Sequence, residues 1–268
     1  MSDTWRQKIA DYCTKYNIPV LYLPETLYEP KVLPMIRGKA FEYSVMLALQ
    51  KILPQNEWKI TKASINEELG HDTDLKIIHK RTGKVIRVEC KLARKEGLRS
   101  YKDGHSEVIV KCMRSRTLGA AKVKELAPKL GIAENVLSIH NDQYLPADFD
   151  VVATSIGNAF YRTDKKTGLY EWTPKKTEED FLQKLSAKER ENVKDFAFNS
   201  IYFARAKDLA VSTNTGITCV RRQCKNKTNC GFIPDNPLIR FDAKTMMPTN
   251  GWVPIEKCKA LFKRFVVS

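Results

Sequence analysis

Residues 72–91, "DTDLKIIHKRTGKVIRVECK", decide how the chain is expected to fold. Two short apolar runs flank Arg81-Thr82-Gly83, which is typical of a tight turn between antiparallel strands. The pattern therefore predicts a β-hairpin whose strands span residues 74–79 and 84–91. Charged side chains stand at the far ends of both strands, whereas the middles of the strands are apolar enough to be buried.

The hairpin is predicted to gather these charged side chains in one place. Residues two apart in a strand point to the same face and lie about 6.6 Å apart, at ~3.3 Å per residue. Glu89 and Lys91 therefore share a face, and so do Asp72 and Asp74 on the partner strand. Because the turn is midway between them, antiparallel pairing brings Asp74 close to Glu89.

Two neighbouring carboxylates repel each other, and burying them without compensation is costly. A divalent cation removes this conflict, and Mg²⁺ takes one or two protein carboxylates while water and phosphate oxygens complete its shell. We therefore expect Asp74 and Glu89 to bind Mg²⁺, with Asp72 as a rival to Asp74. Lys91 would orient or deprotonate the attacking water, or offset charge in the transition state of phosphodiester hydrolysis.

The chain of 268 residues carries a formal net charge of +15, and this charge is clustered. Residues 76–124 contain 15 Lys and Arg against 4 Asp and Glu, and residues 219–268 contain 10 against 3. Such clustering is the electrostatic footprint of a nucleic-acid partner, and the alternative is a merely solvated basic surface. Long apolar runs and the apolar core of a signal peptide are absent from the sequence, so we expect a cytoplasmic protein without a membrane span.

Outside the hairpin, apolar periodicity predicts four helices, at residues 3–16, 38–53, 117–130 and 178–195, and strands at 149–156 and 200–211. The proline-rich residues 20–34, "VLYLPETLYEPKVLP", are expected to be extended or irregular. This order predicts an α/β fold with a mixed central β-sheet flanked by helices. We assign residues 1–215 to the core. Residues 216–268 form a basic, Cys-containing extension or belong to the same domain.

The hairpin and the helix before it resemble the active site of the PD-(D/E)XK nuclease superfamily, the fold of many type II restriction endonucleases. In that family an acidic residue opens one strand, here Asp74, and Glu/Asp-X-Lys ends the next, here "ECK" at residues 89–91. A glutamate on the preceding helix is frequent, and Glu42 in "RGKAFEYSVML" matches its place. Thr73 stands where the family has proline, which leaves the carboxylate chemistry intact.

The resemblance implies a restriction-endonuclease-like core over residues 38–155 and a catalytic set of Asp74, Glu89 and Lys91, with Glu42 assisting. It implies Mg²⁺ as the cofactor, with Mn²⁺ as a substitute. The implied enzyme is cytoplasmic and prokaryotic, cuts double-stranded DNA at a short specific sequence as a homodimer, and belongs to a system with a separate DNA methyltransferase.

Two other functions stay open. A repair, recombination or transposition nuclease of the same fold would share the chemistry but would recognise a DNA structure or a partner. A non-catalytic basic protein would bind DNA without cutting it. Substitution of Lys91 separates a nuclease from a DNA-binding protein, because only a nuclease would lose cleavage while keeping its affinity for DNA.

Six basic side chains follow the hairpin directly. Arginine and lysine in such a position hold phosphates, and arginine also reads guanine in the major groove. The alternative for each of them is a solvated loop residue. The expected DNA-contacting side chains are Arg94, Lys95, Arg99, Lys102, Arg114 and Arg116.

The chain has seven cysteines, which in a cytoplasmic protein indicate free thiols or a metal site. Cys219, Cys224, Cys230 and Cys258 are candidate ligands of a structural zinc or iron ion, although their spacing differs from paired CxxC ligands. Reduced thiols without metal are the alternative, and Cys90 is expected to pack in the core. The sequence shows no His-rich metal motif and no GxxxxGK[ST] loop that would predict an ATPase.

Overall fold

The computed structural model describes residues 4–63, 73–186 and 192–267. Its central sheet has six strands in the order β1-β2-β3-β6-β9-β11. These strands are β1 (Trp58–Lys62), β2 (Leu75–His79), β3 (Val85–Cys90), β6 (Val151–Ser155), β9 (Ile201–Arg205) and β11 (Val253–Pro254). Strands β3 and β6 pair in parallel and the other neighbours pair antiparallel. The predicted α/β fold with a mixed sheet is therefore confirmed.

The predicted hairpin forms as β2 and β3. Leu75 lies opposite Val88, and the same register continued by one residue places Asp74 opposite Glu89, as expected. Gly83 in the turn has a φ of 70°, a left-handed conformation that glycine adopts without steric cost. The hairpin therefore fixes the relative position of the two predicted acids.

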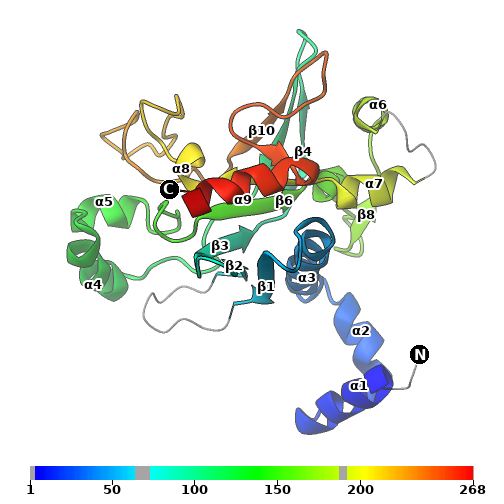
Figure 1. The fold of residues 1–268 in the computed structure, drawn as a ribbon. Helices are drawn as coiled ribbons and strands as arrows, with labels where there is room; N and C mark the ends of the chain where they lie inside the picture. Colours follow the sequence, from blue (N-terminus) through cyan, green and yellow to red (C-terminus); the bar gives the residue numbers. More distant parts are fainter. Residues whose placement is uncertain (1–3, 64–72, 187–191, 268) are drawn as a thin grey trace.

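Two helices cover one face of the central sheet, α3 (Leu33–Ile52) and α9 (Cys258–Val267) (Figure 1). The predicted helix at residues 38–53 is confirmed as part of α3. Apolar side chains of α3, of α9 and of the strands form one buried cluster, which includes Phe41, Val45, Leu49, Leu75, Ile77, Val88, Cys90, Phe203, Cys258 and Phe262. The predicted packing of Cys90 in the core is confirmed, and residues from both ends of the described chain bury the back of β3.

A second sheet, in the order β10-β5-β4, lies toward the other face of the central sheet. Its strands are β4 (Ala93–Ser100), β5 (Ser106–Val110) and β10 (Leu238–Phe241). Helices α6 (Lys176–Leu185) and α7 (Val193–Asn199) occupy the region predicted as one helix at 178–195. Side chains of these elements join those of β6 and β9 in a second apolar cluster, which includes Val108, Phe149, Val152, Phe160, Phe181, Tyr202 and Phe241.

The β4–β5 hairpin rises away from the central sheet, beside the segment that follows β10 (Figure 1). Its base is bulged, because the register shifts between Ala93 and Leu98 and Glu96 has a φ of 53°. A Cβ atom at Gly97 would lie 2.4 Å from the carbonyl oxygen of Arg94, so glycine is required there. The bulge redirects the hairpin outward.

The segment 216–268 contributes to all of these layers. Strand β10 pairs with β5, strand β11 pairs with β9, and α9 packs on the apolar cluster beneath β3. Ile239 and Phe241 of β10 are fully buried. The basic segment is thus part of both sheets and of the core.

The expectation that residues 20–34 are extended is wrong. They form a short 3-10 helix, η1 (Val20–Tyr22), helix α2 (Leu23–Tyr28) and the start of α3. Pro24 and Pro34 each occupy the first turn of a helix, where an N–H group has no acceptor within the helix and its loss costs nothing. Helix α1 (Thr4–Lys15) confirms the prediction at 3–16, and it extends with α2 away from the sheets (Figure 1).

The remaining elements are short and connect the layers. The helix predicted at 117–130 is α4 (Ala120–Leu130). The others are α5 (Glu134–Ile139), η2 (Ile156–Phe160), β7 (Tyr161–Thr163), β8 (Tyr170–Trp172), α8 (Ala206–Leu209) and η3 (Ile255–Lys257). Within the described residues, no helix combines the length and the apolar character that crossing a lipid bilayer requires.

Candidate active site

Asp74 lies immediately before β2 and is fixed by its neighbours on both sides. Its carboxylate Oδ2 accepts a hydrogen bond from the backbone N–H of Cys90 at 2.8 Å. Its carbonyl oxygen accepts one from the N–H of Ala63, next to β1, at 3.1 Å. Asp74 therefore stands at the end of β3 beside Glu89. Asp72, its predicted rival, and His71 lie outside the described residues.

Glu89 and Lys91 form an ion pair at the end of β3, as their shared face predicts. The Lys91 Nζ lies 2.7 Å from Glu89 Oε1, and the two side chains are only 16% and 4% exposed. The Tyr144 hydroxyl bridges them, since it accepts from Lys91 Nζ at 3.0 Å and donates to Glu89 Oε1 at 3.0 Å. Tyr144 was not predicted, because it is 53 positions from Lys91 in the chain.

Tyr144 is held in place by a buried network. The guanidinium of Arg114 lies over its ring, 4.9 Å from the centroid. That guanidinium donates to the Gln143 carbonyl oxygen at 2.9 Å and to Asp148 Oδ2 at 2.5 Å. The ring of Phe149 packs edge-on at 5.1 Å. Arg114, predicted to contact DNA, thus has its guanidinium engaged inside the protein, where it positions Tyr144.

Glu42 projects from α3 to the same place. Lys39, one turn earlier, lies with its Nζ 2.8 Å from Glu42 Oε1 and 3.8 Å from Asp74 Oδ1. The ammonium of Lys62, at the end of β1, contacts the other carboxylate oxygen of Glu42. The structure therefore brings Glu42, Asp74 and Glu89 together, and we call these three acids the carboxylate cluster.

Burial and mutual repulsion shape the ionisation of this cluster. Burial raises the pKa of Asp74 to about 7, and the negative charges of Glu89 and Glu42 add to the shift. Burial also acts to raise the pKa of Glu42, but hydrogen bonds from two lysines outweigh it and the pKa is lowered. Burial acts to lower the pKa of Lys91, but the charge of Glu89 outweighs it and the pKa is raised, so Lys91 is an ammonium ion.

The carboxylate cluster has the donor set that Mg²⁺ prefers, because all its ligand atoms are carboxylate oxygens. Burial is the largest cause of the raised pKa of Asp74, and repulsion by Glu89 and Glu42 adds to it, so a cation between the acids would be stabilised. The bridging Lys39 side chain is 72% exposed and can move into solvent. Among the described residues, the carboxylate oxygens of these three acids do not all lie within 4.8 Å of one another.

The predicted DNA-contacting residues fall into two groups. Arg94, Arg99 and Lys102 are exposed on β4 and the tip of the β4–β5 hairpin, and Arg116 is exposed before α4. Lys95 and Arg114 are only partly exposed. The Lys95 Nζ lies 3.7 Å from the centroid of the Tyr170 ring and also contacts the Thr163 hydroxyl. The four exposed residues are therefore the ones available at the surface.

A second set of ligand side chains lies apart from the hairpin. In the described part of the chain, one group of three or more His, Cys, Asp and Glu side chains has all its ligand atoms within 4.8 Å of one another. Its members, which we call the thiol cluster, are His140, Cys219, Cys224 and Cys230.

The predicted grouping of cysteines is correct for Cys219, Cys224 and Cys230, which the structure brings together, but wrong for its fourth member, Cys258. Cys258 does not join the other three cysteines, because it opens α9 and is fully buried in the apolar cluster beneath β3. His140 takes the fourth place. It was missed because it stands alone, 79 positions before Cys219, and a single histidine carries no spacing signal.

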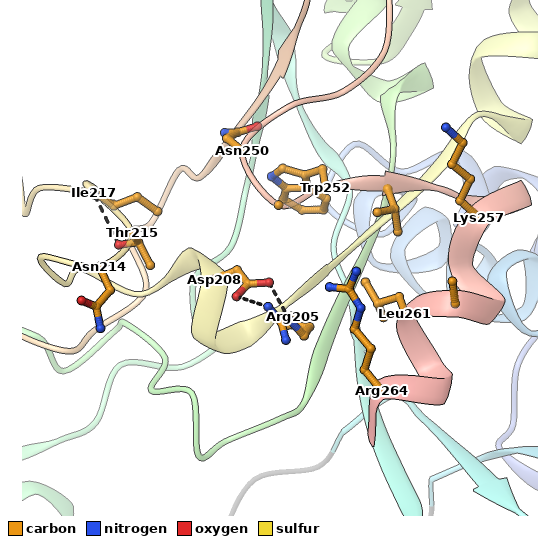
Figure 2. A pocket seen from close by; sticks show the side chains of 13 residues that line it. Arg205, Asp208, Asn214, Thr215, Ile217, Asn250, Trp252, Lys257, Leu261 and Arg264 are labelled. Atoms are coloured by element: carbon orange, nitrogen blue, oxygen red, sulfur yellow. Dashed lines mark hydrogen bonds and ion pairs between the residues drawn. The ribbon is translucent and has the colours of Figure 1, made fainter. Parts of the chain in front are cut away.

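A hollow of about 540 Å³ lies beside α8, β11 and α9 (Figure 2). In Figure 2 the guanidinium of Arg205 reaches Asp208, to which it donates at 2.6 and 2.8 Å. Trp252, Lys257 and Leu261 belong to the same wall. The wall is built from these C-terminal elements, and the hollow is therefore separate from the carboxylate cluster at the end of the hairpin.

Comparisons of this chain with protein-family models, with curated proteins and with solved structures found no match. The geometry of the two clusters is therefore the basis for assigning a function.

Proposed function

We propose that this protein is a Mg²⁺-dependent endonuclease with a restriction-endonuclease-like core, which hydrolyses phosphodiester bonds of double-stranded DNA at a specific sequence. The observation that carries the proposal is the convergence of Asp74, Glu89 and Lys91 at the ends of β2 and β3, with Glu42 of α3 beside them. The position of β3 in the middle of a mixed sheet supports it, because a buried strand holds these groups rigidly.

Asp74 and Glu89 would hold the metal ion, with Glu42 next to them. Mn²⁺ would substitute for Mg²⁺, because carboxylate oxygens suit both ions. When bound, the ion supplies an activated water and offsets charge on the phosphate. The backbone N–H of Cys90 keeps the Asp74 carboxylate in place whether or not the ion is present.

Lys91 is placed to act on the substrate. Its ammonium is fixed by Glu89 and by the Tyr144 hydroxyl, so it can donate to the attacking water or to a phosphate oxygen without reorganisation. Tyr144 positions both residues of the pair. Lys39 and Lys62 balance the charge of Glu42 while no substrate is bound.

The surface supports DNA as the substrate. The net charge is +15, and four exposed basic residues follow the hairpin in the chain, three on β4 and the β4–β5 turn and one before α4. Lysine and arginine in such positions neutralise phosphates, and arginine on a projecting hairpin can also reach base edges in the major groove. These residues are Arg94, Arg99, Lys102 and Arg116.

A homodimer is part of the proposal, because cutting both strands of a twofold site is simplest with a twofold enzyme. The arm formed by α1, η1 and α2 supports it, since large apolar side chains are exposed along it and such surfaces favour association. They are Trp5, Tyr12, Tyr16, Leu21, Tyr22 and Tyr28. The proposed enzyme acts in a prokaryotic cytoplasm, alongside a separate DNA methyltransferase.

The decisive experiment is digestion of a mapped plasmid in Mg²⁺, followed by sequencing of the ends. Discrete fragments are expected from the wild-type protein. Lys91→Met should lower the cleavage rate by at least about 10³-fold, because it removes the charged donor at the reacting phosphate. DNA affinity, measured by fluorescence anisotropy in Ca²⁺, should change little. Lys51→Met, at an exposed position of the same helix as Glu42, is the matched control and should cleave normally.

Other outcomes decide against the proposal. Cleavage restricted to junctions, or a smear without fixed ends, would identify the repair or recombination nuclease. Binding without hydrolysis in either Mg²⁺ or Mn²⁺ would identify a non-catalytic DNA-binding protein.

A further inference from the structure

The residues between α8 and β10, 210–237, form a long segment without a helix or a strand, which we call the Cys loop. Connections longer than about 12–15 residues without secondary structure are uncommon unless something else fixes them. At its ends the loop is anchored by Ala210, Val211, Phe232 and Ile233, which are buried in apolar clusters. Between these anchors, at residues 212–231, the buried side chains of the small apolar cluster are the thiols of Cys219 and Cys224, so apolar packing alone is a weak explanation for the order of this middle part.

The spacing of the thiol cluster fits one tetrahedral ion. Zinc binds sulfur at about 2.3 Å and imidazole nitrogen at about 2.0 Å, which places neighbouring tetrahedral ligands about 3.5–3.8 Å apart. All four ligand atoms of the cluster lie within 4.8 Å of one another without any ion present. A small contraction brings them to a single zinc ion.

His140 supplies an independent sign of a missing ligand. Its ring is fully buried and stacks on Phe232 at 4.2 Å. Nδ1 lies 2.5 Å from Oε1 of Gln143, so this nitrogen carries the proton. In the described part of the chain, Nε2 is buried and has no hydrogen-bond partner. A metal-binding histidine has this arrangement, in which the second nitrogen donates to an orienting oxygen.

The backbone around the sulfur atoms is also arranged for thiolates. The N–H of Arg221 donates to Cys219 Sγ at 3.4 Å, and the N–H of Phe232 donates to Cys230. Each donor stands two residues after its cysteine. Gly231, with a φ of 81°, allows the turn at the second site. Cys224 lies opposite, with its Sγ 3.4 Å from the Asn226 carbonyl oxygen, a contact that the thiol proton makes and that metal binding would break.

We propose that His140, Cys219, Cys224 and Cys230 bind one structural Zn²⁺ ion, which fixes the Cys loop to the segment that carries Tyr144. Binding releases three protons, one from each thiol, while His140 binds as the neutral imidazole. The resulting centre carries one negative charge in total. The basic side chains of the same loop offset this charge, and they are Arg222, Lys225 and Lys227.

The ion joins two distant parts of the chain. Gln143 contacts His140 through its side chain and Arg114 through its carbonyl oxygen, and Arg114 in turn packs on Tyr144. From the loop, the N–H of Ile233 donates to the Tyr144 carbonyl oxygen at 2.8 Å. Zinc would therefore fix the segment around Tyr144 through His140 and through the Cys loop. The expectation that removal of zinc lowers the cleavage rate rests on the proposed function.

The test is the metal content of the whole protein, purified without added metal or chelator. Mass spectrometry should find about one zinc per chain, and a mercurial thiol reagent should release it. Replacement by Co²⁺ should give the intense visible bands of a tetrahedral ion and a thiolate-to-cobalt charge-transfer band. None of these readouts requires DNA, so their failure is distinguishable from failure of the proposed nuclease function.

Variants assign the ligands. Cys224→Ser should lose the zinc, and its Tm should fall by about 10 °C or more, because structural zinc contributes directly to folding. His140→Cys should keep the zinc with an altered Co²⁺ spectrum. Cys258→Ala, which changes a buried thiol outside the cluster, should keep zinc at the wild-type level. If Cys224→Ser does not fold, the metal content and the Co²⁺ spectrum of the wild-type protein decide.

Three results would overturn the proposal. The first is a folded wild-type protein without zinc that also gives no tetrahedral Co²⁺ spectrum. The second is iron in place of zinc, or a disulfide that removes two of the titratable thiols. The third is a Cys258→Ala variant that loses metal as completely as Cys224→Ser.

Discussion

The carboxylate cluster and the thiol cluster are both proposed metal sites, but the chain builds them in different ways. The acids come from α3, from the start of β2 and from β3, and the central sheet holds them rigidly while lysines balance their charge. Three of the four side chains of the thiol cluster come from one irregular loop, whose middle part has few buried apolar side chains. The difference teaches what each proposed ion would do: the fold holds the acids in place for a Mg²⁺ ion that exchanges, whereas a permanent Zn²⁺ ion would itself hold the Cys loop in place.

The largest expected effect separates the two clusters. Asp74→Asn should lower the single-turnover cleavage rate by about 10³-fold, because loss of a metal ligand removes several kcal/mol of transition-state stabilisation. Zinc content should stay at the wild-type level, since asparagine can still accept the hydrogen bond from Cys90. Asp180→Asn on α6 is the control and should change neither quantity. Loss of zinc together with cleavage would show that the clusters form one unit.

The second effect is on stability, and it tests whether burial and mutual repulsion of the acids in the carboxylate cluster destabilise the folded protein at high pH. The pKa of Asp74 is about 7 in the folded protein against 3.8 for an ordinary aspartate. Between pH 4 and 7 the folded state therefore keeps a proton that the unfolded state has lost, and the free energy of unfolding falls as pH rises. Asp74→Asn removes this fall in the free energy of unfolding, which is on the order of 2 kcal/mol after screening by solvent.

Urea denaturation at pH 5 and pH 8 measures this difference, in magnesium-free buffer without a chelator that would attack the thiol cluster. Relative to wild type, Asp74→Asn should gain stability at pH 8, whereas Asp180→Asn should keep the wild-type pH dependence. Parallel curves for Asp74→Asn and wild type would mean that the folded protein does not raise the pKa of Asp74.

The third effect probes the Tyr144 hydroxyl, which bridges Lys91 and Glu89. Tyr144→Phe removes both hydrogen bonds of this hydroxyl and should lower the cleavage rate by about 10-fold, or about 1.4 kcal/mol. Zinc content should not change. Tyr202→Phe, at a buried position in the second apolar cluster, is the control. Equal losses in both variants would assign the effect to packing and not to the bridge.

The smallest effect concerns Lys39, the exposed lysine beside Glu42 and Asp74. Lys39 lies 3.8 Å from Asp74 but is largely exposed, so its competition with a cation is screened. Lys39→Met should therefore lower the Mg²⁺ concentration for half-maximal cleavage by only about 3-fold. Lys51→Met on the same helix should leave that concentration unchanged. A higher Mg²⁺ requirement for Lys39→Met would mean that this lysine assists the ion.

The sequence was sufficient where local rules decide the structure. The turn at Gly83 and the alternation of β2 and β3 set the register, and the register places Asp74 beside Glu89. The helical stripe around Glu42 predicted α3, which brings that side chain to the acids. These elements lie close together in the sequence, so the positions of Glu42, Asp74 and Glu89 could be predicted from their spacing along the chain.

The rest depends on contacts between distant segments, which spacing does not encode. Tyr144 and His140 are single residues without a pattern, and the fold alone brings them to Lys91 and to Cys219. Cys258 is near the other cysteines in sequence but packs in another cluster. Strand β4 carries four charged residues, because it lies at a sheet edge and its outer face meets solvent, whereas β5 lies between β4 and β10 and is buried. In β4 the apolar alternation that would have predicted a strand is therefore weak.

The covering of one face of the central sheet by α3 and α9 has a consequence for how the molecule acquires its structure. The apolar cluster on this face, which includes Val88 of β3, also contains Phe41 of α3 and Phe262 of α9. Until both have docked, the strand that carries Glu89 has an exposed apolar face and is not fixed. Contacts of such large sequence separation form slowly, so the carboxylate cluster and Lys91 should be among the last groups to be ordered as the chain folds.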